Sequence, residues 1–142
     1  MKNCSRTIQI TFLSIFLLIL LACIPGGIGL LYEQDLDNDY AVWAADDIVQ
    51  ACVVKKIENS NSASCKVPPM VFAYGWNKRY ILAKQYSQKS PFDVDTTKAN
   101  WFIVDMKNDK VYGPMTESEY LETREMLGVP AKIDFTVELE IK

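Results

Sequence analysis

The distribution of hydrophobic positions divides the chain into an apolar N-terminal segment and a body of short alternating runs. Residues 7–31 read TIQITFLSIFLLILLACIPGGIGLL and contain no charged side chain. At the rise of an α-helix, these 25 residues are long enough to cross a hydrocarbon core of about 30 Å. The segment therefore predicts a membrane helix that attaches the chain to a membrane.

The charges on the two sides of this segment differ in sign. Lys2 and Arg6 precede it, and only acidic side chains follow it closely: Glu33, Asp35, Asp37 and Asp39. Positive charge is retained on the cytoplasmic side of a bacterial membrane. The pattern therefore predicts that residues 1–6 lie in the cytoplasm, that 32–40 form an acidic linker, and that 41–142 form an extracytoplasmic domain.

Three fates fit the apolar segment. As an uncleaved signal anchor it spans the membrane. As a lipoprotein signal it ends at Cys23, because Leu20-Leu21-Ala22-Cys23 resembles the bacterial lipobox, in which Cys23 carries the lipid. As an ordinary cleaved signal peptide it lacks a clear small-x-small site. Leu21 departs from the lipobox, whereas Pro25 interrupts a helix, so the pattern favours the anchor and leaves the lipoprotein open.

After the acidic stretch, the pattern changes to that of β-strands. Apolar, β-branched runs at 41–44 and 48–54 predict a first hairpin, and runs at 70–74 and 80–84 predict a second. Polar composition predicts loops, and shorter apolar runs predict further strands. The loops are expected at 55–66 and 85–100, and the strands at 101–106, 111–112 and 133–141.

One helix is signalled by the residues at its ends. Thr116 can accept a backbone hydrogen bond, and Glu119 three residues later can bond back to it. Gly128, followed by Pro130, supplies the stop. These residues predict a helix over 117–127. The predicted fold class is α+β, with an N-terminal membrane helix followed by a small antiparallel sheet that carries this helix on one face.

Charge limits the partners of the body. The net charge of the chain is -3, but residues 32–142 hold 13 of the 15 basic and all 18 acidic residues, so the body carries -5. Nucleic acids and anionic lipid surfaces are bound by clustered Lys and Arg. The acidic body therefore argues against nucleic acid. The expected partners are the membrane, through 7–31, and an unknown envelope protein.

The chain contains no histidine. This removes the commonest metal ligand and the side chain best suited to proton transfer near neutral pH. Zinc enzymes of the usual kind and nucleophile systems that depend on histidine are excluded, and no cofactor motif is present. We therefore expect a protein without a cofactor and without enzymatic activity. Two alternatives stay open, a hydrolase that uses carboxylates alone and a module that binds a small ligand.

Two cysteines of the body are candidates for a disulfide. Cys52 and Cys65 bracket a Ser/Asn-rich stretch, and the predicted extracytoplasmic location permits oxidation. The bond would close a loop of about 14 residues and stabilise the fold by roughly 3 kcal/mol in the chain-entropy model. The alternative is a buried thiol at Cys52 and a free thiol at Cys65.

A predicted hairpin loop has the composition of an interaction surface. Trp76, Lys78 and Arg79 combine an aromatic side chain with two cations, a composition that is enriched at binding hot spots. The alternative is that Trp76 folds back and covers the edge of the sheet.

Four aspartates have the spacing of a calcium loop. They are Asp35, Asp37, Asp39 and Asp46. Tyr40 stands at the position where such a loop requires glycine. The pattern therefore favours an acidic linker over a calcium site.

Residues 100–130 carry a resemblance to a known family. The stretch reads NWFIVDMKNDKVYGPMTESEYLETREMLGVP, with the apolar strand 101–105, the run 111–116 and then the predicted helix. It resembles a segment of short, uncharacterised bacterial lipoproteins and membrane proteins, the domain of unknown function 3997. Weaker similarity reaches back to 67–69 and 80–84. The resemblance implies a common fold and a bacterial envelope setting, and it implies no activity and no functional residues.

The expected function is that of an envelope protein. We expect the chain to be anchored in a bacterial membrane, with its N-terminus in the cytoplasm, and to present a small domain on the other side. With neither a catalytic set nor a cofactor motif, the domain is expected to act as a protein-interaction or structural module.

The fate of the apolar segment is tested at Cys23. If residues 7–31 form an uncleaved anchor, Cys23→Ser leaves membrane association intact, because attachment requires no lipid on the sulfur. The mass of the mature protein then matches the full chain, which fractionation and intact-protein mass spectrometry measure. Incorporation of labelled palmitate that disappears in Cys23→Ser contradicts the anchor and establishes the lipoprotein.

Overall fold

The β-branched runs of the body pair into two antiparallel sheets. In a computed structural model that describes residues 29–90 and 93–141, the first sheet has the strand order β1-β2-β3-β4. Its elements are β1 (Tyr32–Asp35), β2 (Tyr40–Ala44), β3 (Cys52–Lys56) and β4 (Ala63–Val67), with a short 3-10 helix, η1 (Ile48–Gln50), between β2 and β3. We call it the N-terminal sheet.

The second sheet has the order β8-β7-β6-β5-β9 and is called the C-terminal sheet. Its strands are β5 (Val71–Trp76), β6 (Tyr80–Ser90), β7 (Asp93–Asp105), β8 (Lys110–Met115) and β9 (Val137–Glu138). The helix α2 (Glu117–Met126) lies between β8 and β9 along the chain. Each sheet therefore consists mainly of strands that are neighbours in sequence, as short hairpin connections require.

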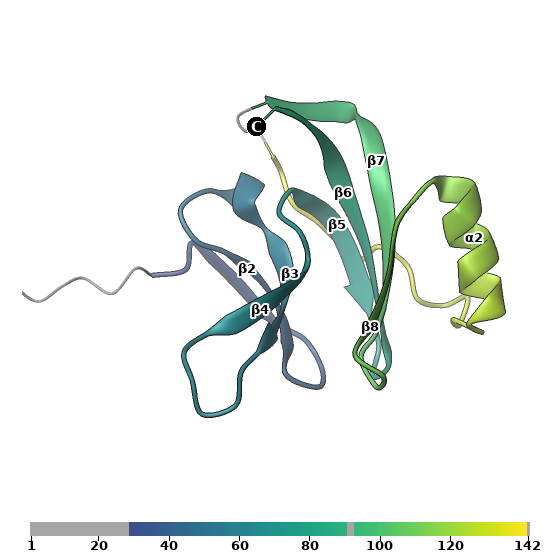
Figure 1. Cartoon of the computed structure of the whole chain (residues 1–142), viewed down its shortest axis with the longest axis horizontal. Helices are drawn as coiled ribbons and strands as arrows, with labels where there is room; N and C mark the ends of the chain where they lie inside the picture. Colours follow the sequence, from purple (N-terminus) through teal and green to yellow (C-terminus); the bar gives the residue numbers. More distant parts are fainter. Residues whose placement is uncertain (1–28, 91–92, 142) are drawn as a thin grey trace, which may run out of the picture.

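The N-terminal sheet, the C-terminal sheet and α2 form three successive layers (Figure 1). The alternation of side chains along β6 explains why the C-terminal sheet lies in the middle. Ile81 and Ala83 belong to the core between the two sheets. Tyr80 and Leu82 belong to a second core, which contains Tyr120 of α2. Because both faces are buried, this part of the strand is apolar at every position.

The predicted helix is present, with the predicted cap. The Thr116 hydroxyl accepts a hydrogen bond from the Glu119 backbone at 3.4 Å, and the Glu119 carboxylate accepts one from the Thr116 backbone at 2.8 Å. After the helix, Gly128 adopts φ +62°, a conformation that favours glycine. Arg124 donates to the Pro130 carbonyl at 3.0 Å, which ties the helix to the segment that follows it.

The C-terminal segment lies against β5 because Gly75 has no side chain. A Cβ atom at Gly75 would lie 1.8 Å from the Asp134 carbonyl oxygen, so any other residue would push this segment away. The backbone N–H of Thr136 donates to Tyr74 at 3.1 Å. Only Val137–Glu138 form a strand here, whereas the alternation predicts a strand over 133–141.

Polar contacts at Asp109 and at Tyr74 join the sheets. In the turn between β7 and β8, the Asp109 carboxylate accepts a hydrogen bond from the Tyr40 hydroxyl at 2.5 Å and pairs with Lys66 of β4 at 2.9 Å. The Tyr40 hydrogen bond and then Lys66 lower the pKa of Asp109 to about 2. The hydroxyls of Tyr32 and Tyr74 lie 2.5 Å apart and join β1 to β5. Strand β1 is thereby tied to both sheets.

The predicted fold class is wrong. The sequence predicts an α+β domain with one antiparallel sheet, whereas the described residues are mostly β, with two sheets and one α-helix. Hairpin signals indicate which neighbouring strands pair, but they do not indicate where one sheet ends and the next begins. Here the break falls after β4, at Pro68 and Pro69.

The start of the domain also differs from the prediction. Most of the predicted membrane helix, residues 7–31, lies outside the described residues. Residues 29–31 are not helical, and the Leu31 N–H donates to the Ala45 carbonyl at 3.0 Å. Among 29–90 and 93–141, no helix is both long enough and apolar enough to cross a membrane. Residues 32–40, predicted as a linker, contain strand β1.

Two predicted loops contain strands. The stretch 55–66 contains the end of β3 and most of β4. The stretch 85–100 contains the second half of β6 and the first half of β7, paired with register shifts after Tyr86 and after Gln88. Conversely, the start of the predicted strand 48–54 is η1.

The Asp109 contact predicts a stability that depends on pH. The pKa of Asp109 is about 2 in the folded chain and about 3.9 in an unfolded one, so its contribution is present above about pH 4 and is lost as the pH falls toward 2. Asp109→Asn should lower the free energy of unfolding at pH 7 by up to about 1 kcal/mol, as for partly exposed ion pairs. In urea unfolding, the difference from the parent should shrink as the pH falls to 2. A difference that stays constant contradicts this role.

Candidate functional site: a groove between the two sheets

The chain crosses from one sheet to the other through Pro68, Pro69 and Met70. Two consecutive prolines have fixed φ and no N–H donor, and Met70 after them adopts φ +78°, so the chain turns where it leaves the N-terminal sheet. Backbone hydrogen bonds hold it on both sides. Met70 donates to Val49 of η1 at 3.0 Å and accepts from Tyr86 of β6 at 3.0 Å. The crossing segment is thereby fixed between the two sheets.

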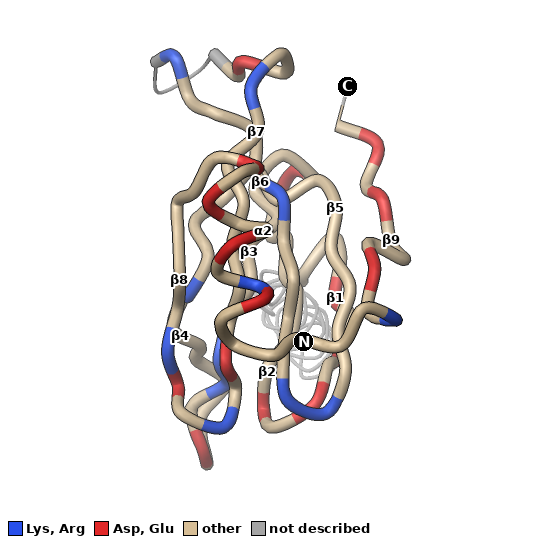
Figure 2. The backbone as a smooth tube through the Cα atoms, turned by 90° about the vertical axis from the view of Figure 1, so that its right-hand side faces the viewer, with Lys and Arg blue, Asp and Glu red and all other residues tan. Residues whose placement is uncertain are grey.

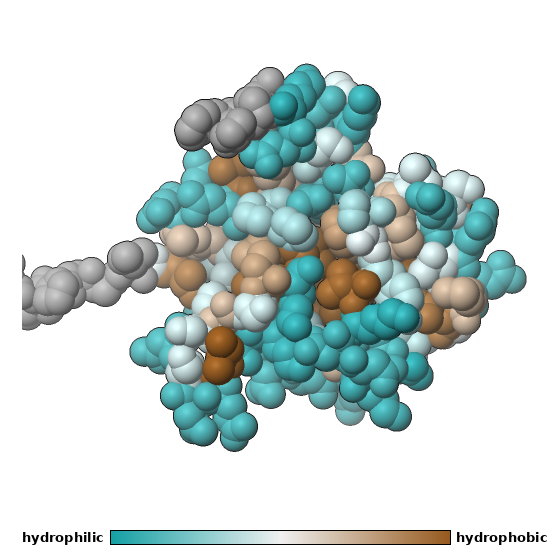
Figure 3. Space-filling view, viewed as in Figure 1, coloured by the Kyte–Doolittle hydropathy of each residue, from teal (hydrophilic) through white to brown (hydrophobic). Residues whose placement is uncertain are grey.

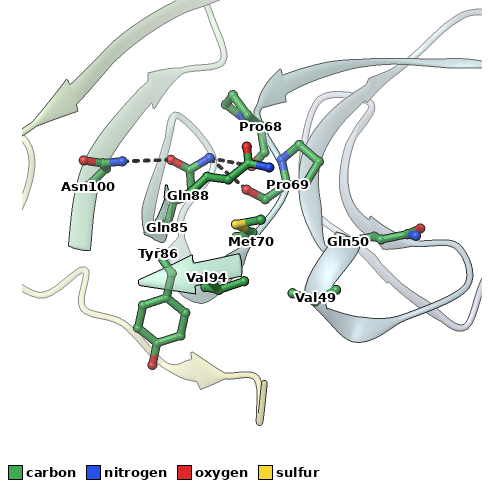
Figure 4. Close-up of a pocket in the computed structure, with 10 residues that line it drawn as sticks. All are labelled: Val49, Gln50, Pro68, Pro69, Met70, Gln85, Tyr86, Gln88, Val94 and Asn100. Carbon is green, nitrogen blue, oxygen red and sulfur yellow. Dashed lines mark hydrogen bonds between the residues drawn. The ribbon is translucent and has the colours of Figure 1, made fainter. Parts of the chain in front are cut away.

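A groove of about 690 Å³ opens beside the crossing segment. Its volume falls in the range of about 300–1,000 Å³ that is common for ligand sites. The walls are η1, the crossing segment, β6 and β7. Figure 4 shows the lining side chains, which are four amides, five apolar residues and one tyrosine: Gln50, Gln85, Gln88 and Asn100; Val49, Pro68, Pro69, Met70 and Val94; and Tyr86.

Gln85 closes one side of the groove by holding the crossing segment. Its side-chain N–H donates to the carbonyl oxygens of Pro69 at 2.8 Å and Pro68 at 3.2 Å. Its side-chain oxygen accepts from Asn100 at 3.2 Å, as the dashed lines in Figure 4 show. Asn100 is the residue opposite Gln85 in the β6–β7 pairing. The donors and acceptor of Gln85 are therefore used within the protein, and its role is to shape the groove.

The other amides leave polar groups available to a ligand. Within the described part of the chain, no side-chain hydrogen bond is formed by Gln88, which is exposed. Gln50 accepts only a long contact of 3.4 Å from the Asp46 backbone. Asn100 uses its amide nitrogen on Gln85, which leaves its oxygen. Each amide side chain carries both donors and an acceptor, so the groove offers both to a bound molecule.

The lining carries no charge. None of the described residues that line the groove is acidic or basic, and none is a serine, threonine or cysteine. The one aromatic ring, Tyr86, stacks on Phe72 with ring centroids 3.9 Å apart, so one of its faces is covered. Such a lining can orient an uncharged polar molecule, but it holds no pair of groups for acid–base or nucleophilic chemistry.

Four carboxylates among the described residues have a lowered pKa. They are Asp95, Asp105, Asp109 and Glu119. Burial by itself raises the pKa of Asp105, but hydrogen bonds from Arg79 and Asn108 outweigh it. A carboxylate hydrolase needs an acid with a raised pKa, and none of these four groups has one.

The structure does not bring the Trp76, Lys78 and Arg79 side chains into one surface. Trp76 ends β5, and its ring packs against the core beside Tyr74, with centroids 6.0 Å apart. Arg79 pairs with the buried Asp105 at 3.2 Å. Lys78 is exposed. Trp76 and Arg79 therefore stabilise the fold at this hairpin.

Cys52 and Cys65 lie next to each other on β3 and β4. Both thiols are free in the structure, and the predicted disulfide stays a prediction. A hydrogen bond joins the two side chains, which lowers the pKa of Cys65 and, with burial, raises that of Cys52. The other candidate thiol, Cys23, lies outside the described residues.

One of the aspartates with calcium-loop spacing, Asp35, makes a side-chain contact within the fold. Asp35 forms an ion pair with Lys56, which also pairs with Glu33 at 3.0 Å. Asp47, next to Asp46, caps η1 by accepting from the Val49 backbone at 3.0 Å. Within 29–90 and 93–141, no cluster of His, Cys, Asp or Glu could hold a metal ion.

A family model covers most of the chain. The model described as "Protein of unknown function (DUF3997)" matches residues 37–142. The chain belongs to this family. No curated protein and no solved structure matches the chain. The match extends the resemblance from 100–130 to both sheets and to every residue that lines the groove, so the groove is part of the family domain.

The sequence did not predict the groove because its lining residues are far apart along the chain and, among those described, none is charged or nucleophilic. The lining comes from four stretches between Val49 and Asn100. Its amide side chains are of a kind that is common on protein surfaces, so the sequence gives no reason to group them. One signal was present. A Pro-Pro pair between two strong strands marks a rigid crossing, and a glutamine on β6, the second strand after it, can donate to its carbonyls.

The role of Gln85 can be measured by substitution. Gln85→Met keeps the length of the side chain but leaves the carbonyls of the crossing segment without their donor. We expect the free energy of unfolding to fall by about 1–2 kcal/mol. Gln88→Met, the same change at an exposed position of the same strand, should alter it by less than about 0.5 kcal/mol. Equal effects in urea unfolding would show that Gln85 does not hold the crossing segment.

Proposed function

We propose that the chain is a membrane-anchored envelope protein whose domain binds an uncharged, extended segment of a partner protein in the groove. The apolar segment 7–31 supplies the attachment, and its flanking charges favour a domain outside the cytoplasm. The observation that carries the proposal is a groove whose described lining includes four amide side chains and no charged one.

The chemistry of the lining matches that of a polypeptide. Every peptide group presents one donor and one acceptor, and the amides of Gln50, Gln88 and Asn100 can meet both. Between them, Val49, Met70 and Val94 offer apolar contacts, and methionine adapts to side chains of different shape. An extended segment suits the site because its peptide groups are not already bonded to one another.

Other classes of ligand fit the lining less well. Nucleic acid requires clustered positive charge, whereas positive and negative residues are interspersed along the domain (Figure 2). Saccharides stack on open aromatic faces, and among the described lining residues the one ring, that of Tyr86, has a face covered by Phe72. Charged metabolites would find no counter-charge among the described residues that line the groove.

The rest of the described surface supports the choice of the groove. Its large exposed hydrophobic residues are spread over distant parts of the chain: Leu30, Leu31, Ile57, Leu121 and Met126. On the face shown in Figure 3, hydrophobic residues form separate patches among hydrophilic ones. Scattered single residues of this kind are normal on soluble surfaces, so they do not compete with the groove as a binding site.

The location of the domain is tested by reporter fusion. Alkaline phosphatase fused after Lys142 should be active, because it folds only outside the cytoplasm of a bacterium. The matched control is the same fusion to a chain with residues 7–31 deleted, which should be inactive. An inactive fusion to the full chain, together with an active cytoplasmic reporter at the same position, overturns the location.

The groove is tested with displayed peptides. The full chain in detergent micelles is used to select from a random peptide library, and selected peptides are synthesised with blocked ends. We expect uncharged sequences whose affinity, measured by fluorescence anisotropy, falls at least tenfold in Val94→Arg. Ile57→Arg, at an exposed position outside the groove, should leave the affinity unchanged. Selection of charged peptides only, or equal binding to both variants, contradicts the proposal.

A further inference from the structure

The two cysteines of the domain lie on the face of the N-terminal sheet that is turned away from the C-terminal sheet. Val53 belongs to the core between the sheets, so its neighbours on β3, Cys52 and Val54, face the other way. Cys65 on β4 is the residue opposite Val54. This pairing places Cys65 diagonally across from Cys52 on the same face, close enough for a hydrogen bond between the two sulfurs.

We infer that Cys52 and Cys65 form a thiol–disulfide exchange site, which takes a disulfide of a peptide or of another protein as its substrate. The site does not depend on the groove, which lies between the sheets. It also differs from the structural disulfide that the sequence predicts, because an exchange site passes between the dithiol and disulfide forms while the domain stays folded.

The exposure of the two thiols indicates which one attacks the substrate and which one resolves the mixed disulfide. Cys65 is exposed, whereas Cys52 is partly buried. Cys65 also lies on β4, the edge strand of the N-terminal sheet, where an incoming disulfide meets no neighbouring strand. The Cys65 thiol donates to the Val67 carbonyl at 3.1 Å, and the neighbouring Cys52 lowers the pKa of Cys65 toward the thiolate, which is the form that attacks a disulfide. Cys65 is therefore the attacking residue and Cys52 the resolving residue.

The exchange is balanced in two steps. The Cys65 thiolate attacks one sulfur of R–S–S–R, which breaks the S–S bond, forms a mixed disulfide at Cys65 and releases one RS⁻. Cys52 then loses its proton and attacks the Cys65 sulfur, which releases the second RS⁻. The two protons given up by the cysteines end on the two RSH products. The protein loses two electrons, and the substrate disulfide gains them.

The backbone around Cys52 and Cys65 can accommodate both the dithiol and the disulfide form. The β3–β4 pairing shifts register between Val53 and Val54, because β4 contributes one extra residue there. Such a bulge lets the strand adjust without breaking the rest of the ladder. Trp43 of β2 lies opposite Cys52, so its fluorescence can report the oxidation state.

The experiment follows both cysteines in the purified full chain. The protein is equilibrated with mixtures of reduced and oxidised glutathione, and free thiols are alkylated and located by peptide mapping. We expect a single Cys52–Cys65 disulfide that forms and is reduced again as the ratio of the two glutathione forms is changed, with an unchanged far-UV circular dichroism spectrum. This measurement needs no variant, so it does not depend on whether a variant folds.

Two variants test the roles. In Cys52→Ser, oxidised glutathione should leave a stable mixed disulfide at Cys65, because the neighbouring thiol that would resolve it is absent. In Cys65→Ser, the reaction at Cys52 should be at least tenfold slower, since this thiol is less exposed. Serine is nearly the size of cysteine, and the circular dichroism spectrum of each variant checks its fold.

Three results overturn the inference. Two free thiols at every glutathione ratio would show that the pair does not form a disulfide. A disulfide that glutathione cannot reduce in the folded chain would make the pair structural. A mixed disulfide that forms faster at Cys52 in Cys65→Ser than at Cys65 in Cys52→Ser would reverse the roles.

Discussion

The burial of β6 and β7 on both faces is the constraint on which the rest of the structure depends. Ile81 and Val104 face the core between the sheets, and Leu82 and Ile103 face α2. A strand pair that is apolar on both faces needs a covering layer on each side. The N-terminal sheet covers one side and the capped helix covers the other. The three-layer arrangement follows from this single strand pair.

The strand pair β6–β7 also determines where the candidate site lies. Beyond the core, β6 and β7 continue as a paired ladder through Gln85 and Asn100, where the side chains are polar. Gln85 uses this position to hold the crossing segment. The groove therefore lies where the central strands leave the core and the chain changes sheets. The cysteine pair lies on a different face, and its chemistry is independent of the groove.

The parts of the fold that the sequence predicted are those that local interactions determine. The cap of α2 is formed by Thr116 and Glu119, three residues apart, and the hairpin of β5 and β6 is formed by adjacent runs. Strand β1 was missed because its alternate positions are acidic, and because it is held by a contact between Tyr32 and Tyr74, which are 42 residues apart. Residues 85–100 read as a loop because polar strands have no hydrophobic alternation.

The candidate site was not predictable for a related reason. Its amide side chains come together only when β6 and β7 pair, as when Asn100 lies opposite Gln85. A single sequence does not show the register between polar strands. The pair of cysteines was noticed from spacing, but the exposure that separates their roles comes from the position of β4 at the edge of its sheet. Trp76, selected for its composition, instead packs against the core.

The central claim is that β6 and β7 are buried between two layers, and native-state hydrogen exchange tests it most directly. In the full chain, the backbone amides of Leu82 and Ile103 should be among the last to exchange, with protection that approaches the global free energy of unfolding. The amides of β6 beyond Gln85 should exchange much earlier. If Leu82 and Ile103 exchange as fast as those amides, the central strands are not covered on both faces, and the account is wrong.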